Sequence, residues 1–208
     1  MHFQNFDREN SYLILDNLMN SGSWKEGLIL SDKWLKDHPR SHRIWYMKAR
    51  LALEAALATG EKDNWIKAHD SFVMAIKLHN KNPRYYYWKS QLAFYRAKLT
   101  KDSEYYRDFI ETMYLTCSLD PNNYFYYSVF FERIAGLFKD PNYLSDPLSR
   151  DLLMNSIRFS LENYLRLKQF YADRYLIEFS TLLRESERKD LLKKTDLNNQ
   201  VRKILELY

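Results

Sequence analysis

The stretch NPRYYYWKSQLAFYRAKL, residues 82–99, decides the fold of this chain. It opens with an asparagine–proline pair, which favours a helix start, and then places four aromatic residues in succession. Successive residues of an α-helix are turned by about 100°, so the four rings at 85–88 point in all directions around the axis. An ordinary surface helix buries only one stripe of side chains. The stretch therefore predicts a helix that other helices enclose on several sides.

The composition indicates a folded protein with a sizeable core. The chain has 208 residues, of which 46% are hydrophobic and 28% are charged, as in ordinary globular domains. Only 4 residues are glycine, which argues against phosphate-binding loops and against sheet-rich folds. The single cysteine, Cys117, excludes an intramolecular disulfide and a multi-cysteine metal site.

The formal net charge of +5 is spread thinly along the sequence. Counting Lys and Arg against Asp and Glu gives +1 for residues 1–60, +2 for residues 61–120 and +2 for residues 121–208. Nucleic-acid binders usually carry a clustered basic stripe or patch, although folding can gather scattered charges on one face. The composition therefore leans against nucleic acid as the partner.

The sequence contains no segment with the pattern of a targeting peptide or of a membrane span. The start, MHFQNFDREN, is polar and partly acidic, unlike a signal or transit peptide. No apolar run approaches the roughly 18 residues that a membrane span requires. We expect a cytoplasmic protein without membrane insertion, an inference that fails if the chain is a fragment of a larger protein.

Helical periodicity extends over nearly the whole sequence. Ser23 and Glu26 have the spacing of a capping box, and Ser41, Asn82, Asn123 and Asp146 are further N-cap candidates. No stretch alternates cleanly as a strand does. The expected fold class is all-α in one domain, with a long loop at 138–147. The pattern predicts about ten helices, at 8–20, 24–37, 41–59, 63–80, 83–99, 103–119, 123–138, 147–166, 169–185 and 195–207.

An aromatic cluster recurs at the head of three of these helices. Trp45, Tyr85 and Tyr124 follow one another at nearly equal intervals, and each follows a turn that contains a proline. Those prolines are Pro39, Pro83 and Pro121. A helical unit that recurs at a spacing of this kind is typical of an α-solenoid.

These units resemble the tetratricopeptide repeats, whose unit is two antiparallel helices with small and aromatic residues at set positions and a proline at the exit. The resemblance covers residues 8–137, although the units are longer than is usual in the family and the second has extra residues around LATGEKD. Beyond about residue 140 the pattern fades. The matching residues are Gly22, Trp24, Gly27 and Pro39 in the first unit, Trp45, Ala49, Trp65, Ala68, Phe72 and Ala75 in the second, and LTCSLDPNN at the end of the third.

The resemblance implies a stack of antiparallel helix pairs in a right-handed superhelix. The pairs are expected at 8–40, 41–82, 83–122 and 123–166, with capping helices at 167–208, all within a single domain 1–208. Along 83–99, the stripe of Trp88, Leu92, Tyr95 and Leu99 suits the seam with the second helix of the same repeat. Tyr85 and Tyr87 would then pack on neighbouring repeats. A register shifted by one residue fits as well.

The remaining side chains of these helices project, in the family register, onto a concave wall of rings and cations. Such a surface suits an extended peptide with acidic or aromatic side chains, because Arg can bind a carboxylate with two hydrogen bonds. Alternatively, most of these rings only pack. The lysine–asparagine carboxylate clamp of some family members has no match here. The residues of the predicted concave wall are Arg43, Tyr46, Met47, Arg50, Tyr86, Lys89, Arg96, Phe125, Ser128 and Glu132.

No pattern of catalytic or metal-binding residues accompanies the helices. His38 and His42 are separated by a turn, and His69 and His79 have no cysteine nearby, so surface or packing roles are expected for them. Cys117 is expected to be an inert core residue. The sequence therefore predicts neither an enzyme nor a cofactor.

The leading hypothesis is a scaffold that binds a peptide segment or partner protein in its groove, and we expect Tyr46 and Arg50 to tolerate alanine without loss of stability. Three alternatives remain open. Helical repeats rich in Arg and Tyr can bind RNA. The helices after residue 147 could pair with a second copy. The chain could also be the repeat region of a larger envelope-associated protein, which a start at Met1 makes less expected.

Overall fold

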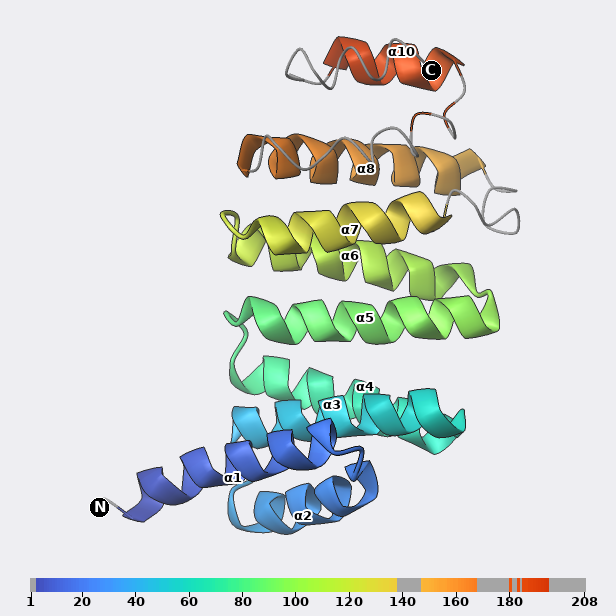
Figure 1. Cartoon of the computed structure of the whole chain (residues 1–208). Helices are drawn as coiled ribbons and strands as arrows, with labels where there is room; N and C mark the ends of the chain where they lie inside the picture. Colours follow the sequence, from blue (N-terminus) through green and yellow to red (C-terminus); the bar gives the residue numbers. More distant parts are fainter. Residues whose placement is uncertain (1–2, 138–146, 168–179, 181–182, 184, 195–208) are drawn as a thin grey trace. The chain divides into compact units, whose positions relative to one another are not determined.

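The structure is a computed structural model that describes residues 3–137, 147–167, 180, 183 and 185–194. All regular secondary structure in these residues is α-helical (Figure 1). The helices are α1 (Phe3–Asn20), α2 (Trp24–Asp37), α3 (His42–Thr59), α4 (Lys62–Leu78), α5 (Pro83–Thr100), α6 (Ser103–Leu119), α7 (Tyr124–Leu137), α8 (Pro147–Leu167) and α10 (Glu185–Lys194).

The first eight predicted helices are confirmed, and most of their ends agree closely with the prediction. The largest difference is at α1, which begins at Phe3 rather than at residue 8. The predicted loop 138–147, the N-cap at Asp146 and most of the helices at 169–185 and 195–207 lie outside the described residues. The expectation of self-association through the C-terminal helices therefore stays a prediction.

Helix α10 occupies residues that the list of expected helices left unassigned. The segment ESERKDLLKK consists mostly of strong helix formers. Lys189 Nζ also lies 2.6 Å from Glu185 Oε1, an ion pair across one helical turn. Local propensity therefore favours a helix in this charged stretch.

The N-caps of α3, α5 and α7 are confirmed. The Ser41 hydroxyl accepts a hydrogen bond of 3.5 Å from the backbone N–H of Ile44. The Asn82 and Asn123 side chains accept bonds of 3.1 Å and 3.3 Å from the backbone N–H two positions further along. The capping box at Ser23 is wrong, because this residue makes no side-chain cap bond and its hydroxyl instead accepts a bond from Ser21 Oγ.

The starts of helices α3 to α7 repeat at a constant interval. The interval from His42 to Pro83, the starts of α3 and α5, equals that from Lys62 to Ser103, the starts of α4 and α6. The same interval separates the start of α5 from that of α7 at Tyr124. We name this interval the helix period. Burial follows it, since the buried residues Trp65, Ala68, Ser71, Phe72 and Ala75 of α4 correspond to the buried residues Tyr106, Phe109, Thr112, Met113 and Thr116 of α6.

The helix period corrects the alignment of Trp45 with Tyr85 and Tyr124. It aligns Trp45 with Tyr127 instead, and both rings bind the turn that precedes their helix. Trp45 Nε1 donates a hydrogen bond of 2.8 Å to the carbonyl of Pro39. The Tyr127 hydroxyl donates one of 3.3 Å to the carbonyl of Pro121.

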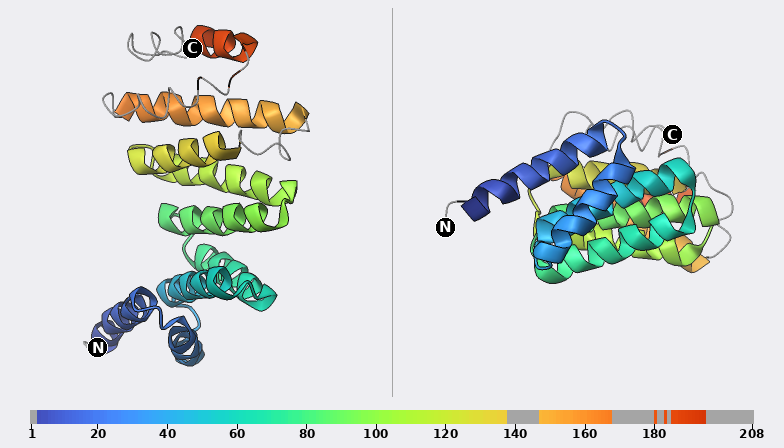
Figure 2. Two further views of the ribbon diagram at one scale, coloured as in Figure 1. Left: turned by 45° about the vertical axis from the view of Figure 1, so that its right-hand side comes forward. Right: turned by 90° about the horizontal axis from the view of Figure 1, so that it is seen from below.

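The chain divides into two compact units. The first, Met1–Leu99 with Glu104–Leu119, contains α1 to α6, and the second, Thr100–Ser103 with Asp120–Tyr208, contains α7, α8 and α10. In the first unit α1 packs against α2 and α3, α2 against α3, and α3 against α4 (Figure 2). In the second unit α7 packs against α8, where Tyr127 and Phe130 contact Phe159. The single domain 1–208 stays a prediction.

Helix α5 is enclosed on two sides, as its four successive rings predict. Tyr85 and Leu92 belong to the core that α1 to α4 form, and Trp88 packs against that core. On another side, Ser90 Oγ lies 2.9 Å from Met113 Sδ and the Phe94 ring lies 5.1 Å from that of Phe109, so this side faces α6.

The predicted seam with α6 is therefore wrong. Trp88, Leu92 and Tyr95 pack toward the preceding helices instead, and Leu99 is 65% exposed. The side that faces α6 carries Ser90 and Phe94. The expectation that Tyr85 packs on a neighbouring repeat is confirmed, since its ring stacks on that of Tyr46.

None of the described helices combines the length and the apolar character that a membrane crossing requires.

Candidate functional site

Two members of the predicted concave wall lie in the core. Tyr46 is 3% exposed and Met47 is 1% exposed, because α3 packs against α1, α2 and α4. In this structure these side chains cannot line an open surface. The premise for expecting Tyr46 to tolerate alanine, an open position on the wall, is therefore wrong, and the substitution would remove a buried ring.

The two arginines of α3 lie nearer to solvent. Arg43 is exposed in the first turn, and Arg50 is half-buried one turn beyond Tyr46. The guanidinium carbon of Arg50 lies 3.3 Å from the centre of the Trp88 ring, and its Nη1 donates a bond of 3.3 Å to the Tyr46 hydroxyl. Its Nε is buried without a hydrogen-bond partner. Arg50 therefore connects α3 to α5 through a cation–π contact.

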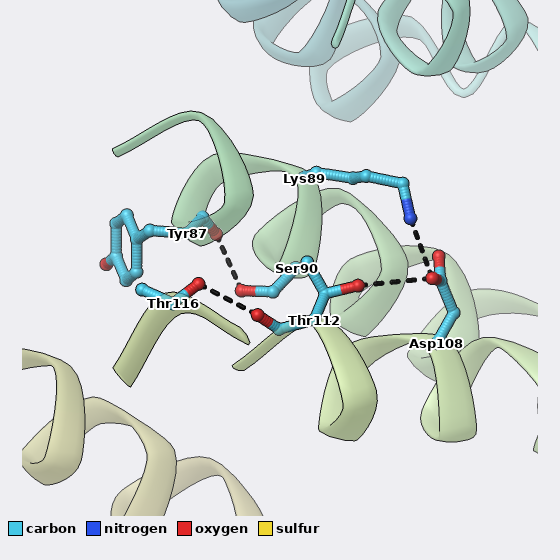
Figure 3. A network of polar contacts seen from close by, with 6 residues as sticks. All are labelled: Tyr87, Lys89, Ser90, Asp108, Thr112 and Thr116. Carbon is cyan, nitrogen blue, oxygen red and sulfur yellow. Dashed lines mark hydrogen bonds and ion pairs between the residues drawn. The ribbon is translucent and has the colours of Figure 1, made fainter. Parts of the chain in front are cut away.

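The members on α5 are all half-buried, and the two cations among them, Lys89 and Arg96, turn toward α6. Lys89 Nζ lies 2.7 Å from Asp108 Oδ1, which also accepts a bond from the Thr112 hydroxyl (Figure 3). The guanidinium of Arg96 lies over the Tyr105 ring, 4.3 Å from its centre. Lys89 and Arg96 thus hold the α5–α6 pair together, and Tyr86 is the remaining member on this helix.

The members on α7 belong to the second unit. Phe125 and Glu132 are exposed, and Ser128 is half-buried with its hydroxyl donating to the Phe125 carbonyl. Burial raises the pKa of Tyr164 on α8, and the charge of Glu132 raises it further. Glu132 therefore lies close enough to α8 to act on it.

Positive charge is sorted by helix among α3 to α6, whereas α1 has one cation and three carboxylates in its sequence. Helices α3 and α5 carry seven cationic side chains and one carboxylate, a net charge of +6. Their partners α4 and α6 together carry four cations and five carboxylates, a net charge of −1. The charged residues of α3 and α5 are Arg43, Lys48, Arg50, Glu54, Arg84, Lys89, Arg96 and Lys98.

Some of these cations are neutralised inside the fold. Lys48 Nζ lies 2.6 Å from Asp32 Oδ1 on α2, and Lys89 is paired with Asp108 as described. Arg43 and Arg84 differ from these, because both are exposed. They occupy the same position, the second residue of α3 and of α5, one helix period apart.

A cluster of rings joins the heads of α3 and α5, and sequence reasoning missed most of it. His42 Nδ1 lies 2.6 Å from the Tyr85 hydroxyl, and the His42 ring stacks on that of His79, with centres 4.7 Å apart. Tyr46 and Tyr85 stack with centres 4.8 Å apart. We name His42, Tyr46, His79 and Tyr85 the aromatic joint.

The charges near the aromatic joint are cationic. Burial, followed by His79 and Arg43, lowers the pKa of His42. Burial raises the pKa of Tyr85 to about 12, so its hydroxyl keeps its proton near neutral pH. Burial also raises the pKa of Tyr46, against the opposing influence of the arginines at 50 and 84. In the described part of the chain, no carboxylate is among the groups that shift these three residues.

The helix period is the signal that could have identified this region. It places Arg43 and Arg84 at equivalent first-turn positions and brings His42 level with Pro83. The nearly equal intervals between Trp45, Tyr85 and Tyr124 obscured it, because they suggest a slightly different alignment of the helices.

Metal or nucleophile chemistry finds little support in the described residues. No group of three or more His, Cys, Asp or Glu side chains gathers there in a way that could hold a metal ion. Cys117 is buried in α6, the position expected of a core residue.

No protein-family model matches the sequence, and no curated protein matches it. Among solved structures, the chain is similar to the crystal structure of TTC0263, a thermophilic TPR protein of Thermus thermophilus, with a TM-score of 0.52. The match covers 96% of this chain and 97% of that chain at 14% sequence identity. This likeness concerns the fold alone. The chain therefore has a tetratricopeptide-like helical-repeat fold, all-α and built from sequential antiparallel helix pairs.

Proposed function

We propose that this chain is a non-enzymatic protein-interaction module that captures an acidic segment of a partner protein at the heads of α3 and α5. The observation that carries the proposal is the sorting of charge, with +6 on α3 and α5 against −1 on α4 and α6. Arginine binds carboxylates through a planar fork with two hydrogen bonds. Opposite charges also speed and orient the encounter of two proteins.

The positions of Arg43 and Arg84 support an acidic ligand. Both lie in the first turn of a helix, where the positive end of the helix dipole disfavours a cation. Neither first turn contains an acidic residue that would compensate. A carboxylate of the partner would satisfy the two guanidinium groups and the helix ends together.

RNA is the second candidate, because phosphates would bind the same cations. Single-stranded RNA is usually gripped by bases stacked on exposed rings. Here Tyr46 and Tyr85 are buried, and the guanidinium of Arg50 covers the face of Trp88. The heads of α3 and α5 therefore offer charge without an open stacking platform, which favours an acidic polypeptide.

The test is affinity capture from a lysate of the source cells with three forms of the full chain. They are the wild type, the double charge reversal Arg43→Glu/Arg84→Glu, and the control Lys62→Glu/Lys77→Glu. The control reverses two exposed cations of α4 and changes the net charge equally. Each capture is repeated after nuclease treatment and at raised salt.

We expect a protein partner that survives nuclease, is lost with the Arg43→Glu/Arg84→Glu variant and is kept by the control. Loss of the captured material after nuclease would favour RNA instead. Equal capture by all three forms would contradict binding at the heads of α3 and α5.

A further inference from the structure

The aromatic joint has a second property, which does not depend on the proposed partner. It is the place where α5 meets the preceding helix pair, and it contains two imidazole groups in contact. His42 is the first residue of α3, and His79 caps the end of α4. Their rings stack at 4.7 Å between centres, with planes inclined by 26°. Both rings also contact Tyr85 of α5.

We propose that the His42–His79 stack is a pH-sensitive joint, which loosens the contact between α5 and the α3–α4 pair when the two imidazoles become protonated. The geometry that supports this is the placement of two titratable rings face to face at the start of one helix and the end of the next, with Tyr85 against both.

The groups around the stack make protonation costly. His42 faces His79 from α4, Tyr85 from α5 and its own neighbour Arg43 on α3. Arg43 also acts on Tyr85, and Tyr12 of α1 acts on the same ring. Over the part of the chain that the structure describes, the charged groups that act on these rings are cationic, and none of them is a carboxylate. A second positive charge in the stack therefore has no negative neighbour there to neutralise it.

The hydrogen bond and the stack respond differently to a proton. With neutral His42, the Tyr85 hydroxyl donates to Nδ1, and the ring proton is on Nε2. Protonated Nδ1 would donate to the Tyr85 oxygen instead, so this hydrogen bond survives with its direction reversed. The stack does not benefit in this way, because two imidazolium rings repel each other at 4.7 Å. The contacts that fail are therefore those of His79 at the end of α4, with His42 and with Tyr85, so α5 loses its contact with the end of α4.

The sign of the effect follows from the lowered pKa of His42. The closed joint binds a proton less tightly than the open one, so the open form gains population as pH falls below the ordinary value of 6.5. Above that value the closed joint keeps its full stability. The active range is therefore the weakly acidic one.

The test measures amide hydrogen exchange of the full chain by mass spectrometry at about pH 7.5 and about pH 5.5, corrected for intrinsic rates. In the wild type we expect segment 83–92 to open about tenfold more often at the lower pH. The variant His42→Gln/His79→Gln should lose this pH dependence. The control His69→Gln, which removes an exposed histidine of α4, should keep it.

Two results would overturn the proposal. One is the same pH response of segment 83–92 in the wild type and in the double variant. The other is an equal increase of exchange in all helices of the wild type at low pH, which would indicate general acid unfolding. An NMR titration of the wild-type histidines is an independent check that needs no variant. It should place the pKa of His42 below 6.5, and a His42 value at or above 6.5 would also refute the joint.

Discussion

Replacing Gly27 by alanine should destabilise the protein, although alanine is the better helix former. Gly27 is buried in α2 where this helix packs on α3. An added Cβ would lie 2.8 Å from both Cδ1 and Cδ2 of Leu51. Ordinary contacts of a Cβ fall at 3.4–4 Å, so at least one side chain must move. Leu51 is fully buried and has little room to do so.

The magnitude is a balance of two effects. Glycine to alanine in a helix interior gains about 1 kcal/mol of intrinsic propensity. Forcing extra atoms into a well-packed core costs about 1–3 kcal/mol. We therefore expect a net loss of about 1 kcal/mol, which for a chain of this size lowers the melting temperature by about 2–4 °C.

The assay is urea unfolding followed by far-ultraviolet circular dichroism, with Leu51→Val as the second arm of a double-mutant cycle. Valine is shorter by one methylene, so Gly27→Ala should cost less in this background than in the wild type. Gly136→Ala is the matched control, because nothing lies within 4 Å of the Cβ that it adds. This variant should raise the stability of the protein by a few tenths of a kcal/mol. Equal or higher stability of Gly27→Ala, or the same cost in both backgrounds, would refute the close α2–α3 packing.

Other predictions concern the heads of the helices and the ion pair between α5 and α6. Thermal melts should show stability falling as pH drops below 6.5, because the pKa of His42 is lowered in the folded state, and His42→Gln should flatten this dependence. Tyr46→Ala should lower the free energy of unfolding by about 3–4 kcal/mol, since it empties a buried site. Arg50→Ala should lower it by only about 1 kcal/mol, because it removes a cation–π contact. Chemical denaturation of both variants distinguishes these values. Lys89→Met should change stability by less than about 1 kcal/mol, because Asp108 is 39% exposed and solvent screens the pair, and denaturation at low and high salt would measure it.

Much of the fold follows from local signals in the sequence. Ser41, Asn82 and Asn123 each fix a helix start, because a side-chain oxygen binds the first free N–H groups. Gly22 and Gly60 adopt positive φ angles at the turns after α1 and α3, a conformation that few other residues take without strain. These signals act within a few residues, so they can be read without knowing the tertiary structure.

The register of α5 could not be predicted in the same way. Its head is aromatic on all sides, so the stripe of Trp88 and Leu92 and the stripe of Ser90 and Phe94 both look suited to the seam with α6. In the structure the second stripe faces α6, whereas Trp88 and Leu92 pack toward the preceding helices. That choice depends on the shape of neighbouring helices.

The candidate surface was hidden for a related reason. A long window such as 61–120 averages over both helices of a pair, so the positive charge of α5 cancels against the carboxylates of α6. When charges are counted helix by helix, α3 and α5 are clearly positive. Arg43 and Arg84 occupy equivalent positions in these two helices. The burial of Tyr46 and Met47 could not be seen either, since it results from packing against three other helices.

The most direct test of the central claim is a binding titration with the partner segment recovered by capture. The segment is compared with a version in which every Asp and Glu is replaced by Asn and Gln. We predict that the acidic segment binds the wild type and the Lys62→Glu/Lys77→Glu control alike, and binds Arg43→Glu/Arg84→Glu at least about tenfold more weakly, a difference of about 1.4 kcal/mol. Equal affinity of the acidic and neutral segments, or equal binding to the arginine variant, would contradict recognition of carboxylates at the heads of α3 and α5.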